Sequence, residues 1–178
     1  MLPYDAEIEY LESTGTQYID TGIKFHETDN INYRIDVKVY VYSTASNYSC
    51  IINNMYEKAP YPGTVLRYKN NKVTSEIGSQ NSIIIGNTNT VLNISYSPND
   101  NRKHNVSSTL FAGYDSKMNP WRFCKLKLYY CKLWNRGELV RDYIPVIKDG
   151  VGYLYDKVSK RMFGNDGTGN FIAGPIIN

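Results

Sequence analysis

The sequence predicts an all-β protein of the sandwich or barrel class, on three observations. Aromatic residues are abundant, with 17 Tyr, 5 Phe and 2 Trp among 178 residues, as is usual where strands dominate. Short runs of alternating apolar and polar residues recur between clusters of Asn, Gly, Pro and Ser. No stretch keeps apolar residues at a spacing of 3.6, so any helix is limited to a turn or two. The length suits a single domain over residues 1–178.

In the first half of the chain the clearest strand covers residues 31–42. Ile35, Val37, Val39 and Val41 alternate there with polar and aromatic residues, which predicts one buried and one exposed face. The acid-rich segment at residues 6–22 is expected to form an earlier strand, with Tyr10, Leu11, Tyr18 and Ile19 facing the core. Shorter strands are predicted at residues 48–52, 64–68, 72–77, 82–85 and 91–95.

The second long strand is predicted at residues 122–134. Cys124, Leu126 and Leu128 share one face there, and beyond the Tyr129-Tyr130 pair the pattern shifts so that Cys131 and Leu133 point inward. That shift predicts a β-bulge.

A hairpin partner for this strand is expected at residues 139–146. Pro145 should interrupt the partner near its end, because proline lacks the N–H that a ladder needs. Asp149-Gly150 and residues 165–169 have the composition of tight turns.

Charge and cysteine content exclude some classes of protein. The net charge is +3, from 20 basic and 17 acidic residues that are scattered along the sequence, so neither nucleic acid nor membrane is expected as a partner. Residues 1–20 hold five acidic residues and no Lys or Arg, unlike a secretory signal. Three cysteines without a Cys-x-x-Cys motif indicate reduced thiols and folding in a cytoplasm. No cofactor is expected.

Both ends of the sequence resemble one known family. Tyr18-Ile-Asp-Thr-Gly22, Leu139-Val-Arg-Asp-Tyr-Ile-Pro145 and Gly152-Tyr-Leu-Tyr-Asp156 look like the ends of a concanavalin A-like, laminin-G-like jelly-roll domain. Such domains occur in surface proteins of gut bacteria and in structural proteins of bacteriophages. The resemblance implies an all-β, two-sheet antiparallel jelly-roll sandwich whose first strand pairs with the C-terminal segment near residues 169–173. Residues 43–120 resemble the family only in their general pattern of short strands and turns.

The opening segment also contains three glutamates in a suggestive spacing. Glu7, Glu9 and Glu12 come close to the acidic triplet of one group of β-sandwich glycoside hydrolases, in which two carboxyls about 5 to 5.5 Å apart act on the sugar. In the family that the chain resembles, however, this segment is an edge strand. We therefore expect a solvated strand face and no enzyme, with hydrolysis as a remote alternative.

Two sets of residues are candidates for recognition. Aromatic rings beside amide-rich loops are typical of sugar binding, because pyranose C–H faces stack on the rings. The carbohydrate candidates are Tyr56, Tyr61, Tyr114, Asp115, Asn119 and Trp121. Tyr40 and Tyr42, on the exposed face of their strand, are candidates for contact with a neighbouring protein. The resemblance leaves calcium open at Asp100, Asp115 or Asp166, but none lies in a calcium-loop motif, so a turn role is preferred.

These observations favour a non-catalytic structural module of a bacteriophage virion, made in the host cytoplasm. A capsid decoration protein or an appendage component would fit, with other virion or surface proteins as partners and host glycans as a further contact. The alternative is a lectin-like, carbohydrate-binding module on a bacterial cell surface.

Overall fold

The computed structural model describes most of the chain. The described residues are 2–24, 33–42, 49–53, 64–69, 72–77, 80–86, 89–96, 107–115, 119–135 and 137–177. Within these ranges the regular structure is β-strand without helix, and every strand pair is antiparallel. No helix suited to crossing a membrane is found in the described ranges. The predicted all-β class is therefore confirmed.

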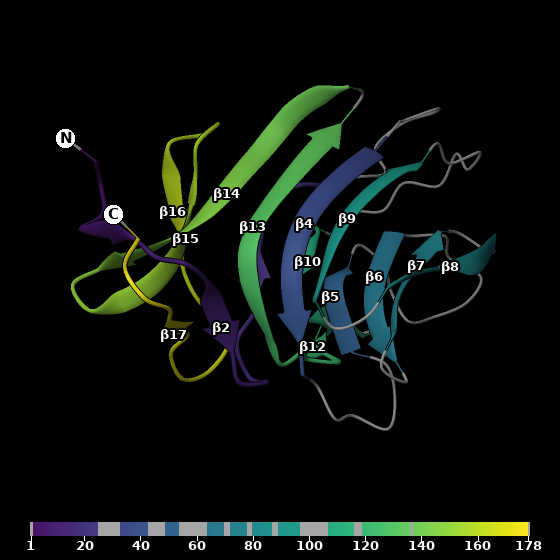
Figure 1. Cartoon of the computed structure of the whole chain (residues 1–178), viewed down its shortest axis with the longest axis horizontal. Coiled ribbons are helices and arrows are strands. Elements are labelled where there is room, and N and C mark those ends of the chain that lie inside the picture. Colours follow the sequence, from purple (N-terminus) through teal and green to yellow (C-terminus); the bar gives the residue numbers. More distant parts are fainter. Residues whose placement is uncertain are drawn as a thin grey trace.

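The strands form two large sheets and a small ribbon (Figure 1). The nine-stranded sheet consists of β1 (Ala6–Glu7), β2 (Leu11–Ser13), β4 (Tyr33–Val41), β9 (Asn89–Tyr96), β13 (Leu126–Asn135), β14 (Glu138–Lys148), β15 (Val151–Asp156), β16 (Arg161–Phe163) and β17 (Ile172–Ala173). The six-stranded sheet consists of β3 (Ile19–Asp20), β5 (Ser49–Asn53), β6 (Thr64–Lys69), β7 (Lys72–Ile77), β8 (Gln80–Gly86) and β10 (Thr109–Leu110). The ribbon pairs β11 (Gly113–Tyr114) with β12 (Pro120–Trp121).

Both large sheets contribute to one hydrophobic core. Val37, Val39 and Val41 of β4 are fully buried, as their alternation predicts, and they belong to the same cluster as Leu66 and Val73 of the six-stranded sheet. Apolar residues at every second position therefore direct one face of each sheet into the core.

The central strand β13 shows the predicted bulge. Its register with β4 shifts between Leu128 and Tyr130, and Leu128 and Cys131 are both buried although three positions separate them. The expected start at Arg122 is wrong, since β13 begins at Leu126. Arg122 has a φ of 53°, a left-handed conformation that cannot continue a strand.

β14 changes neighbours along its length. Its first half pairs with β13 and its second half with β1, while β15 follows it along the other edge. Pro145 does not interrupt the strand, contrary to expectation, and it lies between the two sets of partners. Its carbonyl accepts the N–H of Ile8 at 3.1 Å. Because the N–H and C=O of one strand residue point to the same side, the position that lacks an N–H faces Ile8, just after β1, at the junction between the two partners.

The two ends of the chain pair with each other, as the sequence predicts, and they lie on one side of the molecule (Figure 1). Ile172 and Ala173 of β17 lie opposite Glu12 and Leu11 of β2, and Ile8 bridges to Ile176. The opening segment is nevertheless three short strands with different partners, β1, β2 and β3. Leu11 and Ile19 are buried as expected, whereas Tyr10 and Tyr18 are half-buried.

The three phrases that carry the family resemblance meet at one polar contact. Arg141 of β14 donates from Nη2 to the carbonyl of Thr21 at 2.9 Å and from Nε to the hydroxyl of Tyr143 at 3.2 Å. Its Nε also lies 3.6 Å from a carboxylate oxygen of Asp156, which is fully buried on β15. Arg141 therefore ties β14 to the residue that follows β3 of the other sheet, and these phrases have a structural role.

Candidate functional site

One candidate site lies on the face of the nine-stranded sheet that points away from the core. Tyr40 on β4 lies opposite Lys127 on β13, Lys127 lies opposite Glu12 on β2, and Glu12 lies opposite Ile172 on β17. Residues in register share a face, so these four side chains form one row across four strands. Tyr40 is 40% exposed and Ile172 is 48% exposed. The row therefore presents aromatic and apolar surface to solvent.

Further tyrosines border this row. The rings of Tyr40 and Tyr42 stack at a centroid distance of 6.4 Å, and those of Tyr10 and Tyr129 meet edge to face at 5.8 Å. A Cβ at Gly174 would lie 3.0 Å from the ring of Tyr10, so this glycine leaves room for the ring. We call this surface the tyrosine face; its residues are Tyr10, Glu12, Lys38, Tyr40, Tyr42, Lys127, Tyr129 and Ile172.

Lysines hold two of the rings in place. The ammonium of Lys127 lies 4.1 Å from the ring centroid of Tyr10, and that of Lys38 lies 4.6 Å from that of Tyr129, both within the range of cation–π attraction. A hydrogen bond with Tyr10 raises the pKa of Lys127, as does the neighbouring carboxylate of Glu12. Lys127 therefore keeps its positive charge in the middle of the tyrosine face.

Tyr42 is fixed by the carboxylate of Glu12. Its hydroxyl donates to Oε1 of Glu12 at 2.6 Å and lies 3.1 Å from the carbonyl oxygen of Ser13. Burial raises the pKa of Tyr42, and the hydrogen bond to Glu12 raises it further. The predicted interface residues Tyr40 and Tyr42 thus share one face, and Tyr10 and Tyr129 join them through their contacts with Lys127, with Lys38 and with each other. The Tyr129-Tyr130 pair at the bulge is the sequence signal that could have indicated Tyr129.

The three glutamates of the opening segment do not share one strand. Glu7 is on β1 and accepts a hydrogen bond from the Tyr4 hydroxyl at 3.0 Å, whereas Glu12 is on β2 and contacts Tyr42 and Lys127. Glu9 lies between the two strands and is exposed, and its N–H donates to the carbonyl of Pro175. Glu7 and Glu12 therefore both have partners within the sheet.

A second candidate site is the ribbon of β11 and β12, which packs over β5. A Cβ at Gly113 would lie 2.4 Å from Nδ2 of Asn53 and 3.0 Å from Sγ of Cys50, so glycine is required for this close approach. All five residues of β5 are buried in consequence. The ribbon therefore covers the face of β5 that points away from the core.

The ribbon carries four of the predicted carbohydrate-binding residues, but it does not bring them together in one binding site. Asp115 and Asn119 bond to each other, through Oδ1 with the Asn119 N–H at 2.8 Å and through Oδ2 with its amide nitrogen at 3.2 Å. Trp121 pairs with Gly113 and Tyr114 pairs with Pro120, so Trp121 and Tyr114 point to opposite faces of the ribbon. Tyr56 and Tyr61 lie outside the described residues.

Tyr114 packs toward the first segment of the chain. Its ring meets that of Tyr18 at 6.1 Å. Burial raises the pKa of Tyr114, and the carboxylate of Asp20 raises it further. Asp20 itself accepts hydrogen bonds from Ser107 Oγ at 2.6 Å and from the N–H of Gly22 at 2.8 Å. Tyr114 thus has a structural environment that the segment of Tyr18 and Asp20 supplies.

Of the calcium candidates, Asp166 accepts the N–H of Asp20 at 2.8 Å, and Asp100 lies outside the described residues. In the part of the chain that the structure describes, no three His, Cys, Asp or Glu residues gather as metal ligands would.

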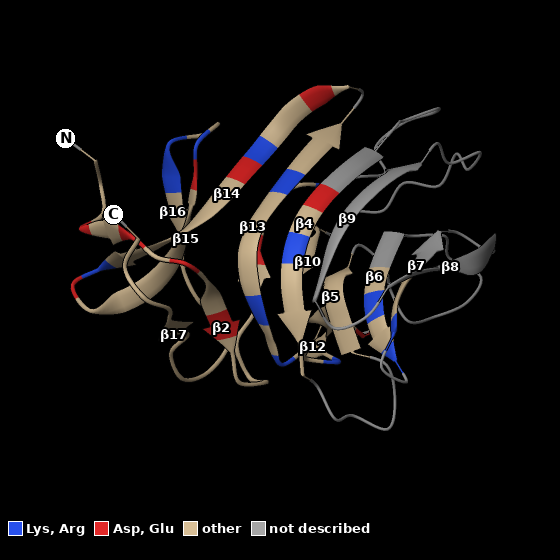
Figure 2. Cartoon of the chain, in the orientation of Figure 1, with Lys and Arg blue, Asp and Glu red and all other residues tan. Residues whose placement is uncertain are grey.

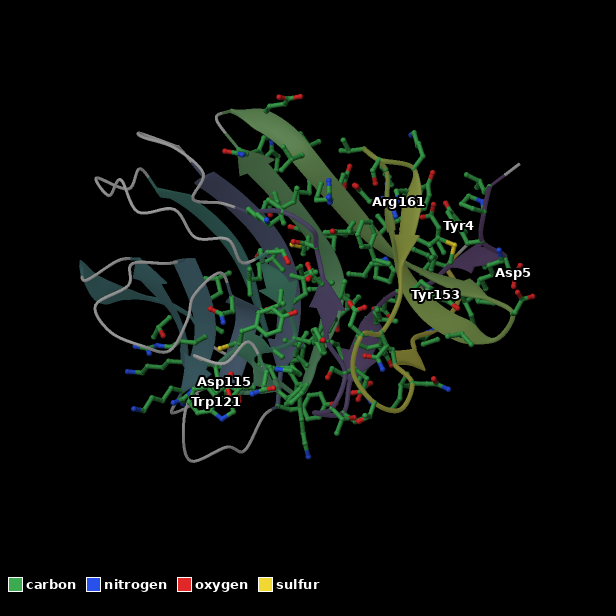
Figure 3. The ribbon with its side chains drawn as sticks, turned by 180° about the vertical axis from the view of Figure 1, so that it is seen from behind. Tyr4, Asp5, Asp115, Trp121, Tyr153 and Arg161 are labelled. Carbon is green, nitrogen blue, oxygen red and sulfur yellow. The ribbon has the colours of Figure 1, made fainter. Side chains whose placement is uncertain are left out.

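Trp121 lies on the other face of the ribbon beside Arg122. The guanidinium carbon of Arg122 is 3.6 Å from the ring centroid of Trp121, and the carbonyl of Arg122 accepts the N–H of Cys50 at 2.9 Å. Figure 3 shows Trp121 and Asp115 together at this end of the molecule, with Tyr4, Asp5, Tyr153 and Arg161 at the opposite end.

Comparison with known proteins gives no match to a family model, to a curated protein or to a solved structure.

Proposed function

We propose that this chain is a non-catalytic structural module of a bacteriophage virion, a capsid decoration or appendage protein that docks on another virion protein through the tyrosine face. The proposal includes the fold: a single domain with a two-sheet jelly roll of the concanavalin A-like type. The shared core of the two sheets and the pairing of β2 with β17 support that fold.

The observation that carries the function is the composition of the tyrosine face. Tyrosine is enriched in protein interfaces, since its ring buries a large area and its hydroxyl can still find a partner. The rings of Tyr10, Tyr42 and Tyr129 are already held by Lys127, Glu12 and Lys38. Binding would therefore order few additional rotamers, which lowers its entropic cost.

The chemistry of this face favours one kind of partner. Tyr40 and Ile172 favour apolar side chains on the partner, and the ammonium groups of Lys38 and Lys127 favour carboxylates beside them. A virion protein with an acidic, partly apolar surface fits both demands.

The experiment is a test of association with purified particles. We expect the chain to be present in virions of the phage that encodes it, and the recombinant protein to rebind particles from which it has been stripped or deleted. Tyr40→Ala should weaken that rebinding about tenfold or more, as truncation of an interface tyrosine commonly does.

Val158→Ala is the matched control. Val158 is also an exposed apolar side chain, 44% accessible, but it lies on the turn after β15. It should rebind like the parent protein. A chain absent from purified virions would refute the proposal, and so would equal rebinding by both variants. Binding to bacterial surface glycans without particle association would favour the lectin-like alternative.

A further inference from the structure

The strand β16 forms one edge of the nine-stranded sheet, with β15 beside it. The N–H of Lys157 donates to the carbonyl of Asp142 on β14. Because backbone groups alternate in direction along a strand, Tyr155, two positions earlier, also directs its N–H and C=O toward β14. Met162 lies opposite Tyr155, so its own N–H and C=O point away from β15. Among the described residues no group bonds to them, and β16 therefore presents an open edge.

Three exposed cations accompany this edge. Lys157 and Lys160 are on the turn that joins β15 to β16, and Arg161 is the first residue of β16. Figure 2 shows these basic positions in blue on β16 and on the turn next to it. Within the described part of the chain, none of the three forms an ion pair. Their charges are therefore available to a partner.

The acids that bond to this turn have other cationic partners. The carboxylate of Asp156 is fully buried, accepts the N–H groups of the turn and lies 3.6 Å from Arg141. The carboxylate of Asp142 lies 3.7 Å from Lys132. These two carboxylates therefore leave the cations of the turn unneutralised.

Two further acids lie on neighbouring elements. Glu7 of β1 accepts the hydroxyl of Tyr4 at 3.0 Å, and Asp166, which follows β16, accepts the N–H of Asp20 at 2.8 Å. Neither forms an ion pair with a cation of the turn. The turn and the start of β16 thus form a positively charged rim beside the open edge.

The two faces of β16 differ in character. Met162 shares a face with Tyr155, on which the ring of Tyr4 lies at a centroid distance of 5.0 Å. Arg161 and Phe163 lie on the other face, because side chains alternate along a strand. Figure 3 shows Arg161 and Tyr4 at the same end of the molecule. A strand added here would meet apolar surface on one face and a cation on the other.

We propose that the open edge of β16 binds an extended acidic segment of another protein, in which Glu or Asp alternates with apolar residues. The segment adds one strand to the sheet and bonds to the N–H and C=O of Met162. Its carboxylates pair with Arg161 and with the lysines of the turn, and its apolar side chains lie beside Met162. This inference does not rest on virion docking through the tyrosine face.

A second copy of the chain fits the edge less well. Pairing β16 with β16 would bring Lys160 and Arg161 of the two copies together, and like charges on paired strands are destabilising. A polyanion such as nucleic acid supplies negative charge, but phosphate oxygens only accept hydrogen bonds, so the C=O of Met162 would gain no donor from them. An acidic strand satisfies both the backbone and the cations.

The test measures binding of the whole chain to three soluble peptides by NMR titration at low salt. An alternating Glu-Val peptide should bind, whereas an alternating Lys-Val peptide should not. An alternating Glu-Pro peptide keeps the carboxylates but lacks the backbone donors of a strand, so it should bind more weakly than Glu-Val. Hydrogen exchange of the Met162 amide should slow when Glu-Val binds, because that N–H gains an acceptor.

Lys160→Gln/Arg161→Gln is the diagnostic variant. Both side chains are exposed, and loss of their charges should weaken binding of the Glu-Val peptide about tenfold. Lys125→Gln/Lys148→Gln is the charge-matched control, since these lysines are also exposed but lie before β13 and at the end of β14. The control should bind like the parent protein.

Four outcomes would overturn the proposal. These are no binding of Glu-Val, equal binding of Glu-Val and Glu-Pro, equal losses in the two variants, and unchanged exchange of the Met162 amide in the complex. Equal binding of the two acidic peptides would assign the cations to a polyanion instead of a strand. None of these outcomes bears on the loss of virion rebinding in Tyr40→Ala, which tests the tyrosine face.

Discussion

Asp156 is a buried charge with a complete set of partners. Its two carboxylate oxygens accept the N–H groups of Asp142 at 2.8 Å, Val158 at 3.1 Å and Ser159 at 3.1 Å, and the hydroxyl of Ser159 at 2.6 Å. Arg141 lies 3.6 Å away. A buried carboxylate is stable only with such partners, so Asp156 fixes the turn after β15 and positions Arg141 at the same time.

Replacing Asp156 with Ala should lower the free energy of unfolding by about 3 kcal/mol, because Arg141 and three backbone donors would lose their partner. Urea denaturation measures this. Lys132→Ala is the control, since it breaks the ion pair between Lys132 and Asp142, where Lys132 is 39% exposed, and it should cost less than about 1 kcal/mol. Equal costs for the two changes would contradict the assigned role of Asp156.

At the scale of the elements, the C-terminal segment is held by Phe171 as well as by strand pairing. Phe171 is 5% exposed, and its ring centroid lies 4.9 Å from that of Phe111, which is fully buried next to β10. The next residue, Ile172, points outward and is 48% exposed. Two consecutive residues of the C-terminal segment therefore make different contributions to the fold.

Phe171→Ala should destabilise the protein by about 3 to 4 kcal/mol, because it removes a buried ring and leaves a cavity. Ile172→Ala should change stability by less than about 0.5 kcal/mol, since the side chain is largely in solvent. Thermal or urea unfolding of the pair of variants gives the comparison. A small effect at Phe171 would mean that the C-terminal segment can leave the core without unfolding it.

The elements could be predicted wherever alternation dominates. β4, β6, β7 and the bulge of β13 follow directly from apolar periodicity, because one-sided burial imposes it. The division of the first segment into β1, β2 and β3 could not be predicted, because the three pieces pair with β14, β13 and β10, which are distant in sequence. The tolerance of Pro145 could not be predicted either, because it lies where β14 changes from one partner to the next.

The candidate sites were predictable in part. The positions of Tyr40 and Tyr42 follow from strand periodicity, because alternation puts these tyrosines on the other face from the buried valines of β4. The contacts of Tyr42 with Glu12 and of Lys127 with Tyr10 depend on pairings between strands that are distant in sequence. Such long-range register is a property of the whole sheet and leaves no local signal.

For the whole molecule, the abundance of tyrosine predicts a loss of stability in alkali. Burial raises the pKa of Tyr4 from 10.0 to about 12, helped by its hydrogen bond to Glu7, and burial also raises the pKa values of Tyr42, Tyr114 and Tyr143. The folded state therefore favours the neutral phenols. Their contribution to stability is complete below about pH 10 and is lost as the pH rises through the folded-state values.

We expect the free energy of unfolding to fall between about pH 10 and 12. The absorbance of tyrosinate should rise at a higher pH in the folded protein than in denaturant. Tyr4→Phe should flatten part of this pH dependence, because Phe cannot ionise. Tyrosines that all titrate near pH 10 in the folded protein would refute the expectation.

The pairing of the chain's two ends affects the rate at which the protein folds. Thr16 bonds to Thr168 across 152 residues and Gln17 to Asn170 across 153, and the buried Leu11 lies beside β17. Closing such long loops costs entropy before any contact repays it. During synthesis, the first strands cannot complete their pairing until residues 168–173 have been made, so this edge of the sheet stays open until then. Refolding should accordingly be slow, in the millisecond-to-second range typical of proteins whose strands pair across long distances, as stopped-flow fluorescence can measure.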